Sequence, residues 1–185
     1  PIFDIEKLDW LSGKYIREDL DDEAFLEQFA EWAFKKEKLM QVAPLLKQRV
    51  ERFSDVASLG SFFFSGLLEV NETSFQHKNL SAADQAKILQ FSLWRLEQLG
   101  DWQRDSIEAA LQSLAECLEL KIRDFLFPLF VAMSGKAVST SVIESLSIIG
   151  LDISRARIRH GIEVLGGISK KQTKNLEKEY RGLSL

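Results

Sequence analysis

The clearest helical signature in the chain lies in Ser81-Ala82-Ala83-Asp84-Gln85-Ala86-Lys87-Ile88-Leu89-Gln90-Phe91-Ser92-Leu93-Trp94-Arg95-Leu96. Ser81 is a favoured N-cap residue, and the acid at Asp84 suits the positive end of a helix. Behind this start, apolar residues recur in steps of three, four and three at Ala86, Leu89, Leu93 and Leu96. This spacing predicts an amphipathic helix with one buried face.

The same periodicity recurs along most of the chain. Stripes stepping by three and four residues lie within 25–32, 46–53, 107–118 and 142–149. Most glycines fall where the stripes stop, and the hairpin pairs Asn-Gly and Asp-Gly do not occur. The sequence therefore predicts an all-α fold, a multi-helix bundle. We expect Ser106 to begin one helix, and Pro44 and Pro128 to stand in the first turns of theirs.

The length of the chain and the breaks in its helical pattern suggest how it is organised. Its 185 residues suit one domain or two small ones. The stretch 66–80 has no clear helical stripe, so we expect a connector there between two packed helical subdomains. We assign residues 1–66 to an N-terminal helical subdomain, 67–80 to the connector, 81–165 to a C-terminal helical bundle and 166–185 to a basic helix or tail.

Composition and charge exclude several classes of protein. Hydrophobic residues make up 45% of the chain and charged residues 28%, which excludes an intrinsically disordered protein. No apolar run is long enough to span a membrane, and the single cysteine, Cys117, fits a reducing compartment such as the cytoplasm. The net charge of −4 hides a gradient, with −8 over residues 1–150 and +4 over 151–185. Such asymmetry indicates local contact with an anionic partner, or a solvated basic helix at the end of the chain.

Catalytic and metal-binding patterns are missing from the sequence. The two histidines, His77 and His160, are isolated, and no metal-ligand spacing or glycine-rich phosphate loop occurs. Cys117 lies beside an apolar stripe with no base nearby in sequence. These features predict a binding module without an active site or a metal site of its own.

Three blocks of sequence point to one family. The first block reads Phe3-Asp4-Ile5-Glu6-Lys7-Leu8-Asp9-Trp10-Leu11-Ser12-Gly13-Lys14-Tyr15-Ile16-Arg17. The second comprises Leu45-Leu46-Lys47-Gln48-Arg49, then Phe53, then Phe62-Phe63-Phe64. The third reads Phe127-Pro128-Leu129-Phe130-Val131-Ala132-Met133-Ser134-Gly135, followed by Ile143-Glu144 and Ile149-Gly150. In order and spacing, residues 3–165 resemble the C-terminal anticodon-binding region of bacterial glutamyl-tRNA synthetases, which are class I aminoacyl-tRNA synthetases.

The resemblance implies a function and a set of partners. It implies that the chain is the tRNA-binding fragment of a glutamate–tRNA ligase, recognising the anticodon loop and stem during tRNA aminoacylation in translation. The family's catalytic motifs are absent from this sequence, so ATP and Mg²⁺ are expected to belong to a catalytic half outside it. The implied partner is glutamate tRNA, with glutamine tRNA left open, and the protein is expected to be a cytoplasmic monomer that binds neither membrane nor metal.

The first two blocks supply three candidate contacts to tRNA. By its match to the family motif, Arg49 is the first choice for an anticodon contact, the alternative being a surface arginine on a helix. Lys7 and Trp10 match positions that face the tRNA stem, where Lys7 would neutralise a phosphate and Trp10 would pack against a ribose. A plain core tryptophan is the alternative for Trp10.

The third block departs from the family at its most informative position. Phe130 stands where the family has an arginine that reads an anticodon base, so it is expected either to stack on a base or to lie in the core. Ser139 stands where the family often has threonine and offers a hydroxyl or backbone contact. Val142 matches an apolar position that packs under a base, and Gly135 permits the tight turn before this loop.

Two questions remain open at the level of sequence. The basic end, with Lys170, Lys171, Lys174, Lys178 and Arg181, either adds phosphate contacts or forms an exposed helix paired with Glu177 and Glu179. The alternative for the whole chain is a helical protein–protein interaction domain with no RNA role, in which the aromatic cluster Phe62–Phe64 anchors a partner in an exposed groove.

Overall fold

The computed structural model describes residues 5–136 and 140–183, and these residues form helices, turns and loops without a strand. The all-α prediction is therefore confirmed. The chain forms two compact units, residues 1–43 and residues 44–185. The stretch expected as a connector, 67–80, lies inside the second unit.

The first unit is built from short amphipathic helices. It contains α1 (Ile5–Lys14), the π-helical turn η1 (Tyr15–Asp19), α2 (Asp22–Ala33) and the beginning of α3 (Lys36–Lys47). Asp21 caps α2, because its carboxylate accepts a hydrogen bond from the Ala24 backbone N–H at 2.8 Å. On α2, the rings of Phe25 and Phe29 stack with their centroids 6.2 Å apart.

The second unit contains the remaining helices. In chain order these are α4 (Asp55–Gly60), η2 (Ser61–Phe64), η3 (Glu72–Phe75), α5 (Ala82–Glu97), α6 (Arg104–Cys117), α7 (Ile122–Ser134), α8 (Val142–Ile149), α9 (Leu151–Val164) and α10 (Lys170–Arg181). The predicted start of α5 is confirmed: the Ser81 hydroxyl accepts from the Asp84 N–H at 3.1 Å, and the Asp84 carboxylate accepts from the Ser81 N–H at 3.0 Å. This reciprocal pair is a capping box.

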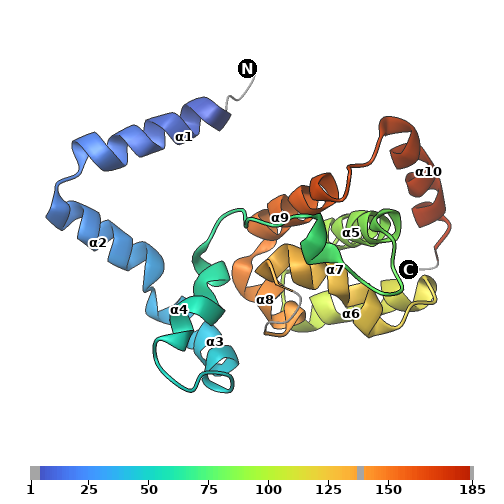
Figure 1. The fold of residues 1–185 in the computed structure, drawn as a ribbon, viewed down its shortest axis with the longest axis horizontal. Helices are drawn as coiled ribbons and strands as arrows, with labels where there is room; N and C mark the ends of the chain where they lie inside the picture. Colours follow the sequence, from blue (N-terminus) through green and yellow to red (C-terminus); the bar gives the residue numbers. More distant parts are fainter. Residues whose placement is uncertain (1–4, 137–139, 184–185) are drawn as a thin grey trace. The chain divides into compact units, whose positions relative to one another are not determined.

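The core of the second unit lies where α5 and α7 both pack against α9 (Figure 1). Leu89 of α5, Phe125 and Leu129 of α7, and Leu146 of α8 are fully buried. Burying each such side chain stabilises the fold by about 1.5–3 kcal/mol. Gly161 of α9 permits this close approach, since a Cβ there would lie 3.1 Å from Leu89 Cδ1 and 3.4 Å from Ala132 Cβ.

Three helix boundaries differ from the sequence prediction. Pro44 and Pro128 lie inside α3 and α7, not in their first turns. In α7 the residues flanking Pro128 explain this, because burial of Phe125 and Leu129 outweighs the lost hydrogen bond to the Asp124 carbonyl. α6 begins at Arg104, before Ser106, and its first turn is held by an Arg104–Glu108 ion pair of 2.7 Å.

The aromatic cluster Phe62–Phe64 is not an exposed anchor. Phe62 and Phe63 of η2 are buried, and their ring centroids lie 4.1 Å apart. The groove proposed for the protein-interaction alternative is therefore wrong, because burial of two of its three rings stabilises the fold itself. Of the helices in the described parts of the chain, none is long and apolar enough to cross a membrane.

Candidate nucleic-acid interface

A hollow of about 440 Å³ lies where α7 meets the start of α8. It is lined by His77, Arg123, Leu126, Phe127, Phe130, Ser141, Val142 and Ile143. The α7 residues recur at spacings of three, four and seven residues, which puts them on one face of the helix. The hollow therefore brings together two of the residues predicted from sequence, Phe130 and Val142.

Aromatic and apolar surface dominates the hollow. Phe130 is half-buried and packs against the core on one side, whereas Val142 is almost completely buried. The expectation that Phe130 lies in the core is met in part, because its side chain packs on the core and also lines the hollow. Stacking of Phe130 on a base stays a prediction. Unpaired bases bind to surfaces of this kind by stacking on aromatic rings.

Arg123 carries the positive charge in the lining of the hollow. Its side chain is exposed, and among the residues that the structure describes it has no hydrogen-bond or ion-pair partner. A guanidinium presents a planar set of donors that matches a base edge or a phosphate. Arg123 lies two helical turns from Phe130, so the hollow combines a stacking surface with a donor although Phe130 itself cannot donate.

His77 forms the wall of the hollow opposite α7. Its ring lies 4.6 Å from that of Phe127, and its Nδ1 accepts a hydrogen bond from the Asn79 backbone N–H at 3.2 Å. In the neutral imidazole the proton is therefore on Nε2, which faces Asp124 Oδ1 at 3.5 Å. These contacts fix the ring of His77 in one orientation beside the stacking surface.

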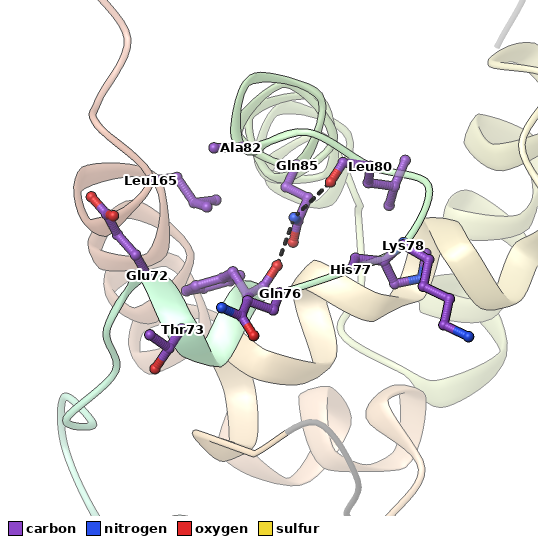
Figure 2. Close-up of a pocket in the computed structure, with 10 residues that line it drawn as sticks. Glu72, Thr73, Gln76, His77, Lys78, Leu80, Ala82, Gln85 and Leu165 are labelled. Atoms are coloured by element: carbon purple, nitrogen blue, oxygen red, sulfur yellow. Dashed lines mark hydrogen bonds between the residues drawn. The ribbon is translucent and has the colours of Figure 1, made fainter.

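His77 also borders a second hollow, of about 690 Å³, between the 72–80 segment and the start of α5. Figure 2 shows Gln85 reaching from α5 into its wall. The Gln85 side-chain amide donates to the Phe75 carbonyl at 2.8 Å and to the Leu80 carbonyl at 3.4 Å (Figure 2). Gln85 thereby ties the segment that carries His77 to the helix behind it.

The loop between α7 and α8 begins at Gly135. Gly135 has φ = 70°, a left-handed conformation that favours glycine, and its N–H donates to the Val131 carbonyl at 2.8 Å. The turn predicted at Gly135 is thus present. Ser139 lies outside the described residues. At the far end of the loop, Thr140 is buried, and its hydroxyl lies 2.9 Å from that of Ser145.

The other candidate residues do not line the hollow. Arg49 lies in the turn after α3, exposed, with its backbone N–H donating to the Leu46 carbonyl at 2.8 Å. Lys7 and Trp10 lie on α1 in the first unit. Trp10 is 59% exposed and carries the ammonium of Lys14 at 5.6 Å from its ring centroid, so it is not a core tryptophan. The roles of all three toward tRNA stay predictions.

A buried arginine holds the end of α7 in place. Arg157 of α9 is 1% exposed and donates to four carbonyls: Gly66 at 2.8 Å, Phe62 at 2.7 Å, Ser65 at 2.6 Å and Met133 at 2.5 Å. Burial lowers the pKa of Arg157 to about 10, so the group is still a cation at neutral pH. A cation suits carbonyls at helix C-termini, which carry partial negative charge. Arg157 thus joins the 62–66 segment to the last turn of α7, next to the loop.

The sequence contained signals for some of the residues that were missed. Arg123 lies seven residues before Phe130, on the same face of an amphipathic helix. Arg157 follows Ser154 by three residues and precedes Ile158 and Gly161, all of which are buried. A charged residue on a buried stripe indicates a polar contact inside the fold. His77 has no such signal, because only the fold brings its loop to α7.

Comparisons with known proteins identify the family of the chain. A sequence model of the family described as "Anticodon binding domain" matches residues 24–162. The glutamate–tRNA ligase of Alcanivorax borkumensis is 51% identical over 183 residues, covering 99% of this chain and 37% of that relative. The glutamate–tRNA ligase of Marinomonas sp. is 48% identical over the same shares. The chain thus spans little more than a third of the length of these relatives.

A solved structure gives the same answer for the fold. The glutamate tRNA ligase from Elizabethkingia meningosepticum superimposes with a TM-score of 0.63 at 24% identity, covering 88% of this chain and 33% of that one. The likeness at this identity concerns the helical fold alone. Together with the match of the family model over most of the sequence, it confirms the resemblance drawn from the three sequence blocks: the chain belongs to the anticodon-binding-domain family.

Proposed function

We propose that this chain binds the anticodon arm of tRNA as part of a glutamate–tRNA ligase. The observation that carries the proposal is the hollow, where Phe130, Val142 and Arg123 meet in a chain of the anticodon-binding family. Among the residues that the structure describes, the guanidinium of Arg123 has no partner. The relatives that match nearly the whole chain are named glutamate–tRNA ligases. Glutamate tRNA is therefore the proposed partner.

In this proposal an unpaired loop base enters the hollow and stacks on the aromatic surface of Phe127 and Phe130. Such stacking contributes about 1–3 kcal/mol per base. The guanidinium of Arg123 then donates a hydrogen bond to the edge of that base or to a phosphate beside it. The apolar side chain of Val142 has no donor and only packs against the base. Gly135 would permit the tight turn before the loop, and Ser139 would offer a hydroxyl or backbone contact.

The remaining candidates would act outside the hollow. Arg49 is proposed to contact the anticodon loop from its exposed turn. Lys7 is proposed to neutralise a phosphate of the stem, and Trp10 to pack against a ribose. The contacts of Lys7 and Trp10 are with phosphate and sugar, so they position the tRNA, whereas Arg49 and the hollow contact the anticodon loop.

The chemical step of a ligase would lie outside this chain. The described residues gather no group of three His, Cys, Asp or Glu side chains that could hold a metal ion, so they do not fit a Mg²⁺ site. We propose that the catalytic part of a complete, cytoplasmic ligase binds both ATP and Mg²⁺. The proposed recognition needs one copy of the chain per tRNA, as in a monomer.

Filter binding tests the proposal. The chain should retain a glutamate tRNA transcript saturably, and should bind more weakly to a matched transcript whose anticodon loop is replaced by a short stable loop. Binding should weaken as salt rises, because phosphate contacts release counterions. Equal affinity for both transcripts would overturn anticodon recognition, and failure to retain either at low salt would favour the protein-interaction alternative.

A further inference from the structure

Helix α10 carries its positive charge on one face. Its five cations are Lys170, Lys171, Lys174, Lys178 and Arg181. At 3.6 residues per turn these positions fall within an arc of about 100°. All five side chains are exposed. We call this surface the basic face of α10.

The helix is held firmly to the rest of the second unit. Tyr180 packs its ring 5.3 Å from that of Phe91 and 5.4 Å from that of Trp94, both on α5. Glu179 of α10 also forms an ion pair with Lys87 of α5. At its start, Ser169 and Gln172 form a capping box, with the Ser169 N–H donating to the Gln172 side chain at 2.8 Å. The basic face is therefore a fixed surface and not a fraying tail.

The pairing expected from sequence is wrong. Glu179 pairs with Lys87 on α5, and among the described residues none of the five cations has an ion-pair or hydrogen-bond partner. Some other surface arginines of this unit are paired, unlike Arg123: Arg155 lies 2.8 Å from Glu97, and Arg104 lies 3.1 Å from Glu144. Leaving five like charges together and unneutralised costs energy unless an anion binds there.

The chemistry of α10 favours a nucleic-acid backbone over a membrane surface. A membrane-binding helix needs an apolar face free to insert. The apolar residues of α10, Leu176 and Tyr180, instead pack against the core of the unit. The exposed surface of α10 also includes Gln172, Asn175 and Glu179, but the five cations follow one face along the length of the helix, which suits a row of phosphates.

We propose that the basic face of α10 binds the phosphate backbone of RNA, independently of its sequence. The helix lies beyond residue 162, where the match to the anticodon-binding family ends, so this contact is additional to anticodon recognition. Because the rest of the chain is acidic, the basic face is a local site for a polyanion. It would hold an RNA in place while the hollow reads an unpaired base.

The test compares two triple variants with two RNA probes. Lys170→Gln/Lys174→Gln/Lys178→Gln removes three charges, and the matched Lys→Arg variant at the same positions retains them. Thermal melts show whether α10 stays docked, together with the change in tryptophan fluorescence between variant and wild type, to which Trp94 contributes through its contact with Tyr180. The probes are the glutamate tRNA transcript and a short RNA duplex without a loop, each titrated from about 50 to 200 mM salt.

We expect the Gln variant to bind both probes more weakly, with the salt slope of log K reduced by about 2–3, because each lost phosphate contact removes about 0.9. The Arg variant should behave as wild type. If the wild-type chain binds the duplex through α10 but shows no preference for the anticodon loop, the proposed function fails and this inference stands. An unchanged slope in the Gln variant, or a wild-type chain that does not bind the duplex, would overturn it.

Discussion

The Nη1 atom of Arg157 in α9 donates a hydrogen bond of 2.5 Å to the carbonyl oxygen of Met133 in the last turn of α7. One turn before Met133 stands Phe130, whose ring lines the hollow, and two residues after it Gly135 begins the loop. The same guanidinium holds the carbonyls of Phe62, Ser65 and Gly66. The position of the hollow thus depends on a buried cation that does not itself line the hollow.

Replacing this cation should destabilise the fold strongly. Arg157→Met should lower the free energy of unfolding by roughly 3–5 kcal/mol, because four carbonyls lose their donor inside the protein. Urea unfolding measures the change. Arg155→Met is the control on the same helix: its exposed pair with Glu97 should contribute about 1 kcal/mol or less. Equal stability of the two variants would show that Arg157 does not hold α7.

Two phenylalanines on α7 should separate packing from recognition. Phe125 is fully buried, and Phe125→Ala should cost roughly 3–5 kcal/mol of stability. Phe130 is half-buried, so Phe130→Ala should cost less stability but weaken tRNA binding by about 1–3 kcal/mol. Thermal melts and filter binding measure the two effects. A Phe130→Ala variant that melts like Phe125→Ala, with unchanged tRNA affinity, would make Phe130 a core residue only.

The guanidinium of Arg123 should matter for binding and not for folding. It is exposed and has no hydrogen-bond or ion-pair partner among the described residues, so Arg123→Gln should leave the melting temperature within about a degree of wild type. The affinity for tRNA should fall by about 1–3 kcal/mol. Lys121→Gln is the matched control, because Lys121 is also exposed at the start of α7 but does not line the hollow. Similar losses of tRNA affinity in both variants would show that Arg123 contributes only a non-specific positive charge.

The capping box of α5 should make stability depend on pH in the acid range. Hydrogen bonds from Ser81 lower the pKa of Asp84 below its value in the unfolded chain. The contribution is therefore fully present above the unfolded pKa of about 4, and it is lost as the pH falls through the lower folded pKa. Ser81→Ala should cost about 0.5–2 kcal/mol near neutral pH and less in strong acid. Urea unfolding of wild type and variant near neutral pH and in strong acid measures this difference. An equal loss in the free energy of unfolding under both conditions would contradict the prediction.

Local sequence patterns predicted most of the helices of the fold. The period of apolar residues and the Ser81 cap predicted α5 as it is observed, because both depend on neighbours in sequence. The prolines were misplaced because burial of Phe125 and Leu129, which depends on other helices, overrides the preference of Pro128 for a first turn. The spacing of residues in the sequence indicates which secondary structure a segment prefers. Packing against other helices decides where a helix begins when two starts are similar in energy.

The residues of the candidate site were harder to predict from the sequence than the helices. Phe130 and Val142 were found by their match to family positions. His77 could not be found in this way, because its place in the hollow depends on the 72–80 segment folding back against α5 through Gln85. Arg157 forms its contacts with residues far away in the chain, at Phe62 and Met133. Contacts of this range follow from the fold and not from any local motif.

The most direct measurement places a fluorescent base in the loop. 2-Aminopurine is introduced at each anticodon-loop position in turn, in an anticodon stem-loop hairpin of glutamate tRNA, and its fluorescence is recorded on adding the chain. Stacking on an aromatic ring in the hollow should change the signal at one loop position, and Phe130→Ala should abolish that change while Lys121→Gln retains it. A signal that does not respond at any loop position, or that responds equally in wild type and Phe130→Ala, would contradict base recognition in the hollow.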